Sequence, residues 1–450
     1  MDSNYKKKNS EDKETSLVQE WYLVFVLMLA FIVSFVDRQV ISLLVQPIKQ
    51  DLGINDTQVS LLMGLAFAIF YVAMGVPIAR LSDYKNRKII IAVGIFFWSV
   101  ATALCGFAKN FTHLFLARVG VGVGEATLTP AAYSMIADAF PANKLARAIA
   151  VYSMGAFLGA GIAGLFGGWA VKAISTWDTG AWPVVGQLSP WQLTFILVSL
   201  PGFALVILIM TTIREPKRTG LRDESKDGAV PMSDVVAFLK LNKKTFGTIF
   251  VAYAFGGIAF YGFMSWIPEF IRRTHGWTIG EAGMLFGGVF AFFGSAGVLS
   301  GGWVCDHLTE KGHEDAAIKC AALFFSAALP LMVAMPLMPS MELTIPVLAL
   351  MSFALASQQA MSPVAIQLVT PNEMRAQITA IFFVVATFPA IGFGATSVAL
   401  LTDYVFQNDA MIRYSLAIVG LVAMSVAAVS LMLGVKVYRE SIARSRAWRS

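Results

Sequence analysis

Twelve apolar runs that repeat along the whole sequence constrain the fold of this chain more than any other feature. Each run is long enough to cross the hydrocarbon core of a bilayer, which takes about 20 residues in a helix. The runs lie near residues 21–46, 57–80, 89–108, 112–138, 145–173, 190–212, 245–271, 279–305, 316–338, 343–369, 375–404 and 412–437. The sequence therefore predicts an all-α membrane protein with twelve transmembrane helices.

The composition supports this class and argues against others. Only 14% of the residues are charged and 57% are hydrophobic, whereas soluble globular domains carry about 25% charged residues. The net charge of +6 does not indicate nucleic-acid binding, because the basic residues lie in short loops between the apolar runs. Cys105, Cys305 and Cys320 have neither a paired nor a metal-ligand spacing. We therefore expect packing cysteines, no metal and no cofactor.

The distribution of Lys and Arg predicts the orientation. If the N-terminus is cytoplasmic, 26 of the 34 Lys and Arg residues fall in cytoplasmic segments and six on the opposite side. Cytoplasmic loops of membrane proteins carry an excess of these residues. We expect a multi-pass protein of the cell (inner) membrane with both termini in the cytoplasm. The remaining two, Arg38 and Arg118, lie inside predicted spans.

The longest connection, residues 214–244, divides the spans into two sets of six, 21–213 and 245–437. It begins as a charged linker and then predicts an amphipathic helix on the inner leaflet. Residues 1–20 and 438–450 are predicted cytoplasmic tails, the first of them disordered. The halves repeat weakly, because Asp83 follows the second span as Asp306 follows the eighth. Such repeats are typical of transporters whose site lies between the halves near the midplane.

Four charged residues inside the first half predict a polar site. Asp37 and Arg38 lie in the first span, and Arg118 and Glu125 lie in the fourth. Seven residues are close to two helical turns, so Arg118 and Glu125 share a face and lie about 10 Å apart. A charge at the bilayer centre costs roughly 2.5–3.5 kcal/mol, so this face must meet protein or a wet cavity. A structural ion-pair network that locks helices together is the alternative.

The chemistry of these side chains suits coupled transport of an anion. Arginine keeps its charge and offers a planar fork to a phosphate or carboxylate, so Arg38 and Arg118 are predicted to hold an anionic headgroup. Asp37 and Glu125 are predicted to carry the proton, because a substrate that takes the arginine away favours protonation of the neighbouring acid. The sequence contains no nucleophile–base arrangement and no ATPase phosphate-binding loop. We therefore expect a carrier driven by an ion gradient, and not an enzyme.

Other candidates lie in the second half. The aromatic residues of the seventh span include Tyr253, which we expect beside the substrate, and packing or contact with lipid is the alternative for this set. Gln358 and Gln359 in the tenth span are polar enough to face a cavity, and helix packing is the alternative. Glu269 and Arg272, near the outer end of the seventh span, are either a solvated gate or plain surface.

Short motifs resemble those of the major facilitator superfamily. LSDYKNRK (81–88) is similar to that superfamily's loop signature after its second helix, and the second half keeps Gly302 and Asp306 from the same signature. The resemblance implies two six-helix halves. It also implies a conformational gate at Asp83, Arg87 and Asp306.

Further motifs resemble the spinster family: FVDRQVISLL (35–44), NRK (86–88), FWS (97–99), RVGVGVGEA (118–126) and IADAF (136–140). This resemblance implies a proton-coupled carrier of lysolipids, such as lysophospholipids or sphingosine-1-phosphate, that works by alternating access. The DR and RxxxGxGE patterns also resemble the anion:cation symporters, which move sugar acids. A carrier of a small organic anion or drug is therefore the alternative. Expected partners are an amphiphilic anion, protons and the lipid bilayer, with no nucleic acid, for a monomeric protein.

Overall fold

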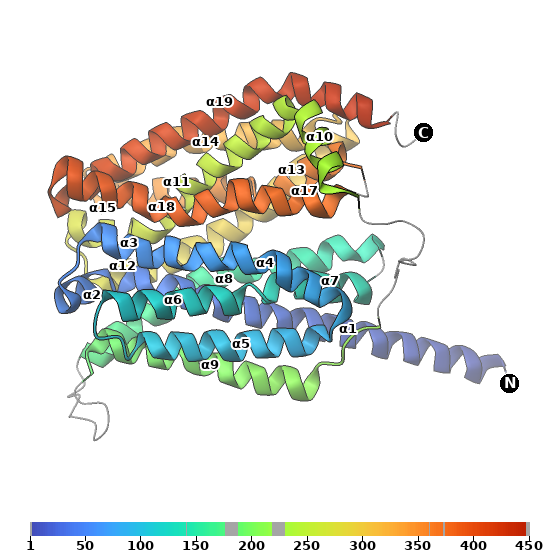
Figure 1. Cartoon of the computed structure of the whole chain (residues 1–450), viewed down its shortest axis with the longest axis horizontal. Helices are drawn as coiled ribbons and strands as arrows, with labels where there is room; N and C mark the ends of the chain where they lie inside the picture. Colours follow the sequence, from blue (N-terminus) through green and yellow to red (C-terminus); the bar gives the residue numbers. More distant parts are fainter. Residues whose placement is uncertain are drawn as a thin grey trace.

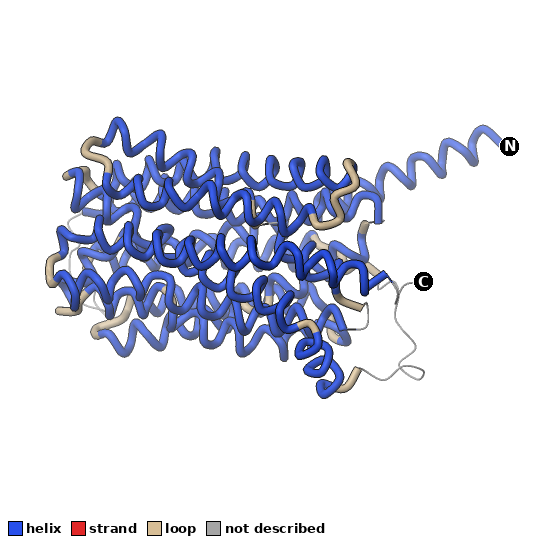
Figure 2. Tube along the Cα trace, turned by 90° about the horizontal axis from the view of Figure 1, so that it is seen from above, coloured by secondary structure: helices blue, strands red, loops and turns tan. Residues whose placement is uncertain are grey.

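The computed structural model describes residues 2–140, 142–175, 188–217, 230–359, 361–371 and 374–446, which form helices and no strands (Figures 1 and 2). The first half contains α1 (Asp2–Gln39), η1 (Val40–Leu43), α2 (Val45–Leu52), α3 (Asp56–Met63), α4 (Leu65–Tyr84), α5 (Arg87–Cys105), α6 (Phe111–Glu125), α7 (Leu128–Ala139), α8 (Ala142–Ser175) and α9 (Pro190–Thr212). The linker and second half contain α10 (Met232–Leu241), α11 (Lys243–His275), α12 (Ile279–Val289), η2 (Phe290–Gly294), α13 (Ser295–Glu310), α14 (Ala316–Leu337), α15 (Met341–Ser357), α16 (Met361–Val369), α17 (Arg375–Phe382), η4 (Phe383–Thr387), α18 (Phe388–Leu400), η5 (Leu401–Phe406), η6 (Asp409–Met411) and α19 (Ile412–Arg446).

These helices make the twelve predicted crossings. Among the described residues, eleven helical stretches are long and apolar enough to span a membrane. The twelfth crossing is the fourth predicted span, which is divided into α6 with 15 residues and α7 with 12. The helix breaks after Glu125 because Thr127 donates both its backbone N–H and its hydroxyl to the carbonyl of Gly124. The prediction of an all-α protein with twelve transmembrane helices is confirmed.

The two halves lie side by side, with most of α1–α9 below and most of α11–α19 above in Figure 1, where α12 lies among the helices of the first half. Both ends of the chain lie at one end of the molecule, which we call the tail side. The opposite end, where α2 leads into α3 and α11 into α12, is the far side. Packing of α8 on α12 and η2, and of α18 on α3 and α4, joins the halves.

Glycines let these joining helices approach closely. A Cβ atom added to Gly164 of α8 would lie 2.4 Å from the carbonyl oxygen of Gly283. A Cβ atom added to Gly64, between α3 and α4, would lie 2.5 Å from the carbonyl oxygen of Ile391. Small residues at such contacts are how membrane helices gain packing energy without a hydrophobic driving force. The seams between the halves therefore depend on backbone-to-backbone contact.

The described ends of the chain are helical. Helix α1 begins at Asp2, within residues 1–20 for which the sequence predicts a disordered cytoplasmic tail, and α19 continues to Arg446, within the predicted tail 438–450. Extending an existing helix needs no new nucleus, which favours helical continuation beyond the span. In the connection 214–244, α10 lies in the part for which a short helix is predicted, whereas residues 218–229 lie outside the described residues.

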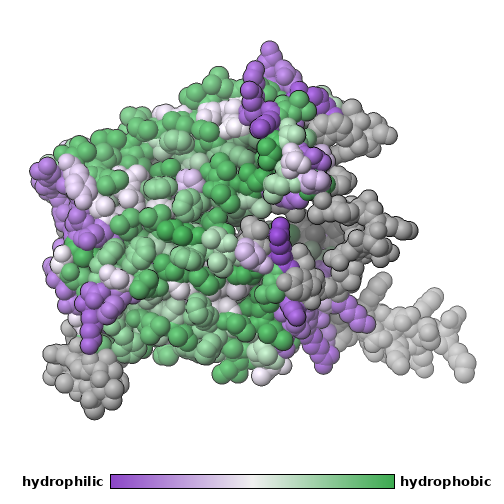
Figure 3. Space-filling view, viewed as in Figure 1, coloured by the Kyte–Doolittle hydropathy of each residue, from purple (hydrophilic) through white to green (hydrophobic). Residues whose placement is uncertain are grey.

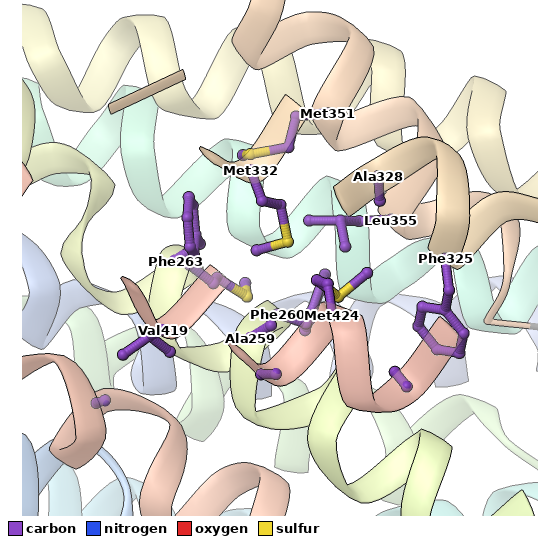
Figure 4. Packing of buried hydrophobic residues seen from close by; sticks show 14 of the residues in the cluster. Ala259, Phe260, Phe263, Phe325, Ala328, Met332, Met351, Leu355, Val419 and Met424 are labelled. Atoms are coloured by element: carbon purple, nitrogen blue, oxygen red, sulfur yellow. The ribbon is translucent and has the colours of Figure 1, made fainter. Parts of the chain in front are cut away.

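The surface and the core fit a bilayer environment. The face seen in Figure 3 is hydrophobic between two hydrophilic ends. Inside the second half, large side chains such as Phe263, Met332 and Met424 pack into one cluster (Figure 4). The three cysteines are buried and unpaired, which confirms that they are packing residues.

Candidate functional site

An ion pair between the first and fourth crossings forms the centre of the site. The Nε of Arg38, near the end of α1, donates to Oε2 of Glu125 at 2.5 Å. The hydroxyl of Ser34, one turn earlier in α1, donates to the same oxygen at 2.6 Å. The Glu125 side chain is fully buried, whereas the Arg38 side chain is 14% exposed. Two of the four charged residues predicted from the sequence therefore meet directly.

Three aromatic rings surround the Arg38 guanidinium. Its central carbon lies 4.4 Å from the ring centre of Phe67, 4.8 Å from that of Tyr71 and 5.0 Å from that of Phe35. Such contacts hold a cation through the faces of the rings and are worth about 2 kcal/mol or more when desolvated. They hold the guanidinium in place on the first-half side of the site.

Arg38 lies on the wall of a cavity between the two halves. The first half contributes Arg38 together with Phe35, Gln39, Ile41, Ser42, Met63 and Phe67, and the second half contributes Tyr261, Met264, Ser265 and Ile391. The side-chain amide of Gln39, in the first half, donates a hydrogen bond to the carbonyl oxygen of Met264, in the second half, at 2.8 Å. The lining is mainly aromatic and aliphatic, and Arg38 is the charged side chain in it.

Arg118 and Asp37 are separated from this cavity. Arg118 is fully buried and donates to two carbonyl oxygens, that of Leu62 at 3.2 Å and that of Asp37 at 3.1 Å. The Asp37 side chain is also fully buried, and neither of its carboxylate oxygens has a hydrogen-bond partner in the described part of the chain. The four charged residues thus divide into a pair at the cavity and a pair enclosed within the first half. The structure does not bring Arg118 to the cavity wall beside Arg38.

The second-half candidates lie away from Arg38. Tyr253 packs against Phe325 and Phe382, with ring centres 5.5 and 5.9 Å apart, and its hydroxyl donates to the carbonyl oxygen of Gln358 at 3.4 Å. Gln358 is buried and follows the last residue of α15, whereas Gln359 is exposed. Gln358 and Gln359 lie where the tenth crossing is interrupted between α15 and α16. The fourth crossing has a similar interruption after Glu125, between α6 and α7.

The expected gate residues have different surroundings. Arg87 of α5 is 1% exposed and forms ion pairs with Asp138 of α7 and with Glu215, which follows α9, so it links these three parts of the first half at the tail side. Asp306 is exposed on α13. Asp83 belongs to α4, and its side chain lies outside the described residues.

Sequence reasoning missed a buried ion-pair network at the far side. Arg273, at the end of α11, contacts both Glu269 at 2.6 Å and, across the two halves, Asp56 at 2.5 Å. Lys49 contacts Asp56 at 2.7 Å and Asp409 of the second half at 2.8 Å. Glu269 and Asp56 are fully buried, so the plain-surface alternative for Glu269 is wrong. These pairs close the far side.

A hydrogen-bonded contact between the halves reinforces this closure. Asp403 accepts from the backbone N–H and the hydroxyl of Thr57 at 2.6 and 2.7 Å. The signal available in the sequence is the scarcity of cations on this side, because Lys49, Arg272 and Arg273 are three of only six Lys and Arg residues predicted there. A Lys or Arg residue on the side of a membrane protein where such residues are few is a candidate for a specific ion-pair partner.

Comparison with known proteins identifies the family. The model of the Major Facilitator Superfamily matches residues 27–395. The chain belongs to the Major Facilitator Superfamily. This membership confirms the two-half fold and makes the protein a membrane transporter and not an enzyme. A solved bacterial homolog of the human lysosomal transporter Spinster, in an inward-facing and unoccupied conformation, has the same fold, with a TM-score of 0.72 and 24% identity over 94% of this chain and 97% of that one.

Curated relatives in this superfamily differ in what they transport. An MFS-type efflux pump of Mycolicibacterium smegmatis is 30% identical over 83% of this chain and 82% of that protein. A probable galactarate/D-glucarate transporter of Bacillus subtilis is 27% identical over 67% of each. Protein spinster homolog 1 of Xenopus tropicalis is 28% identical over 68% of this chain and 58% of that protein. The chain is therefore a spinster-like member of the superfamily that also resembles sugar-acid carriers.

Proposed function

We propose that this protein is a proton-coupled secondary transporter of lysolipids that works by alternating access. The observation that carries the proposal is a single charged side chain, that of Arg38, on the wall of a cavity that is mainly aromatic and aliphatic. A phosphate-bearing headgroup needs one permanent cation, and an acyl chain needs apolar surface. The likeness to spinster proteins supports the same substrate class.

The proton and the substrate compete for Arg38 in this proposal. Arg38 donates to Glu125 through Nε, and in the described part of the chain its two terminal amino groups have no acceptor. An anionic headgroup would bind this free edge through paired hydrogen bonds. It would weaken the hold of Arg38 on Glu125 and so favour a proton on that carboxyl. Asp37, enclosed behind the cavity, would be the second proton carrier.

The lysine and arginine distribution supports a cytoplasmic tail side. With that orientation, the ion pairs at Asp56 and Arg273 would lie on the outer face and hold it closed. The residues of the gate predicted from the sequence, Asp83, Arg87 and Asp306, would act when the tail side closes in turn.

A carrier of a small organic anion is the second candidate, and the sugar-acid transporter among the relatives favours it. A sugar acid presents several hydroxyl groups, each of which must keep a hydrogen-bond partner on entering a protein site. Besides Arg38, the lining side chains that carry polar atoms are those of Gln39, Ser42, Ser265 and Tyr261. Gln39 and Ser42 already bond to each other at 2.9 Å, so the lining suits an acyl chain better than a polyol.

Transport assays with purified protein in proteoliposomes separate the two candidates. A panel of lysophospholipids is compared with galactarate and glucarate, with and without an imposed proton gradient. We expect uptake of lysophospholipids that rises when the gradient is imposed. Gradient-driven uptake of the sugar acids without any lysophospholipid transport would replace the lysolipid proposal with the second candidate.

Arg38→Lys is expected to weaken the apparent affinity for an anionic lysolipid about tenfold or more. Lysine keeps the charge but loses the planar fork and the stacking on three rings. Losing one hydrogen bond to a charged group amounts to about 1.5–3 kcal/mol, and 1.4 kcal/mol corresponds to a factor of ten. The measurement is the concentration dependence of uptake. Arg214→Lys, at an exposed position after α9, is the control, and equal affinities in the two variants would contradict the assignment.

A further inference from the structure

A proline inside α11 removes the usual hydrogen-bond partner of a carbonyl group at the cavity wall. Pro268 lies within this helix. Its ring nitrogen carries no hydrogen, so it cannot donate to the carbonyl of Met264, four residues earlier. Met264 is 4% exposed and lines the cavity. A buried carbonyl group needs a donor, so that of Met264 must find one outside the regular pattern of its own helix.

Gln39 of the first half supplies this donor. Its side-chain nitrogen donates to the carbonyl oxygen of Met264 at 2.8 Å and to Oγ of Ser42 at 2.9 Å. A side-chain amide has two N–H groups, so both are in use. The hydroxyl of Ser42 donates back to the carbonyl oxygen of Gln39 at 2.7 Å, which fixes the glutamine in place. Gln39 is 6% exposed, so its bond to Met264 is shielded from water.

The Gln39–Met264 bond joins the halves between the cavity and the far side. Met264 lies nine residues before Arg273 in α11, which is about 14 Å along the helix axis. Just beyond Met264, the indole N–H of Trp266 donates to the carbonyl oxygen of Ala395 at 2.9 Å and ties α11 to α18. In the described part of the chain, the other hydrogen bonds between the halves join residues that do not line the cavity.

We propose that Gln39 and Pro268 are positioning residues that together hold the two halves in contact beside the cavity in the far-side-closed state. Gln39 provides the donor, and Pro268 keeps the carbonyl of Met264 free to accept. Opening of the far side separates the halves and breaks this bond, whereas the bond from Gln39 to Ser42 lies within one half and persists. This inference rests on the proposed alternating access, and it requires neither a lysolipid substrate nor proton coupling.

The test removes the donor and the acceptor separately and then together. Gln39→Met keeps the length of the side chain without its N–H groups, and Pro268→Ala supplies the missing N–H to Met264 within α11. Ser265→Cys places a thiol on the cavity wall, and a charged, membrane-impermeant thiol reagent is added from the far side to the full-length protein in proteoliposomes. We expect each single substitution to speed labelling about fivefold, the effect of one neutral hydrogen bond. The double variant should label no faster than the faster single one, because both changes remove the same bond.

Two matched controls make the same chemical changes away from the contact between the halves. Gln192→Met removes a buried glutamine that donates to the carbonyl oxygen of Ala108 within the first half, at 2.9 Å. Pro201→Ala restores an N–H inside α9 at an exposed position. Both controls should label at the rate of the protein that carries Ser265→Cys alone. Faster labelling in the controls, equal to that of the test variants, would indicate general loosening and overturn the inference.

The remaining outcomes separate this inference from the proposed function. Effects of Gln39→Met and Pro268→Ala that add in the double variant would overturn the shared bond. Labelling that rises with Asp56→Asn and with neither of these two substitutions would overturn the positioning role and leave alternating access standing. No far-side labelling of Ser265→Cys in any variant, Asp56→Asn included, would contradict alternating access and the inference with it.

Discussion

Glu125→Gln is expected to abolish transport driven by a pH gradient while substrate binding persists. Glutamine has the shape of glutamate but cannot take up a proton, so the step in which substrate and proton exchange at Arg38 is lost. The amide oxygen can still accept from Arg38, whose three aromatic contacts are unchanged. The guanidinium therefore stays in the cavity wall and available to an anion.

Two measurements on one reconstituted sample test this expectation. Uptake of a lysophospholipid is followed with and without an imposed gradient, and binding of the same lipid is measured at equilibrium. Glu440→Gln, which changes an exposed carboxylate on α19, is the matched control and should transport normally. Full gradient-driven uptake by Glu125→Gln would remove Glu125 from the coupling mechanism.

Asp56→Asn is expected to open the far side. Asp56 is fully buried and pairs with both Arg273 and Lys49, and removing one partner of a buried ion pair costs about 3–5 kcal/mol. That energy is lost from the far-side-closed state alone, because the pair with Arg273 joins the two halves. A loss of this size shifts the balance between far-closed and far-open states by more than about a hundredfold.

Accessibility to a thiol reagent measures this shift. Ser42→Cys places a thiol on the cavity wall, and the three native cysteines are buried. A charged, membrane-impermeant reagent added from the far side should label this thiol much faster when Asp56→Asn is also present. Asp51→Asn is the control, because Asp51 bonds to Ser189 and Trp191 of its own half. Equal labelling rates with the two aspartate variants would show that the Asp56 pairs do not hold the gate.

The sequence identifies Arg38 and Glu125 because a charge inside an apolar run is costly and therefore conspicuous. It also predicts a shared helical face for Arg118 and Glu125, which both lie in α6, but the two side chains have separate partners. Arg118 meets carbonyl oxygens of α1 and α3. Helical periodicity gives the direction of a side chain along one helix and carries no information on which neighbour packs there.

The sequence by itself determined the twelve crossings, the two halves and the identity of the ionisable residues inside them, because bilayer thickness and the cost of buried charge act on local composition. Only the tertiary structure decided which charges meet. Arg273 and Asp56 lie 217 residues apart, and their contact depends on how two halves pack along glycine seams. The division of Arg38, Glu125, Arg118 and Asp37 into a cavity pair and an enclosed pair depends on the same long-range packing.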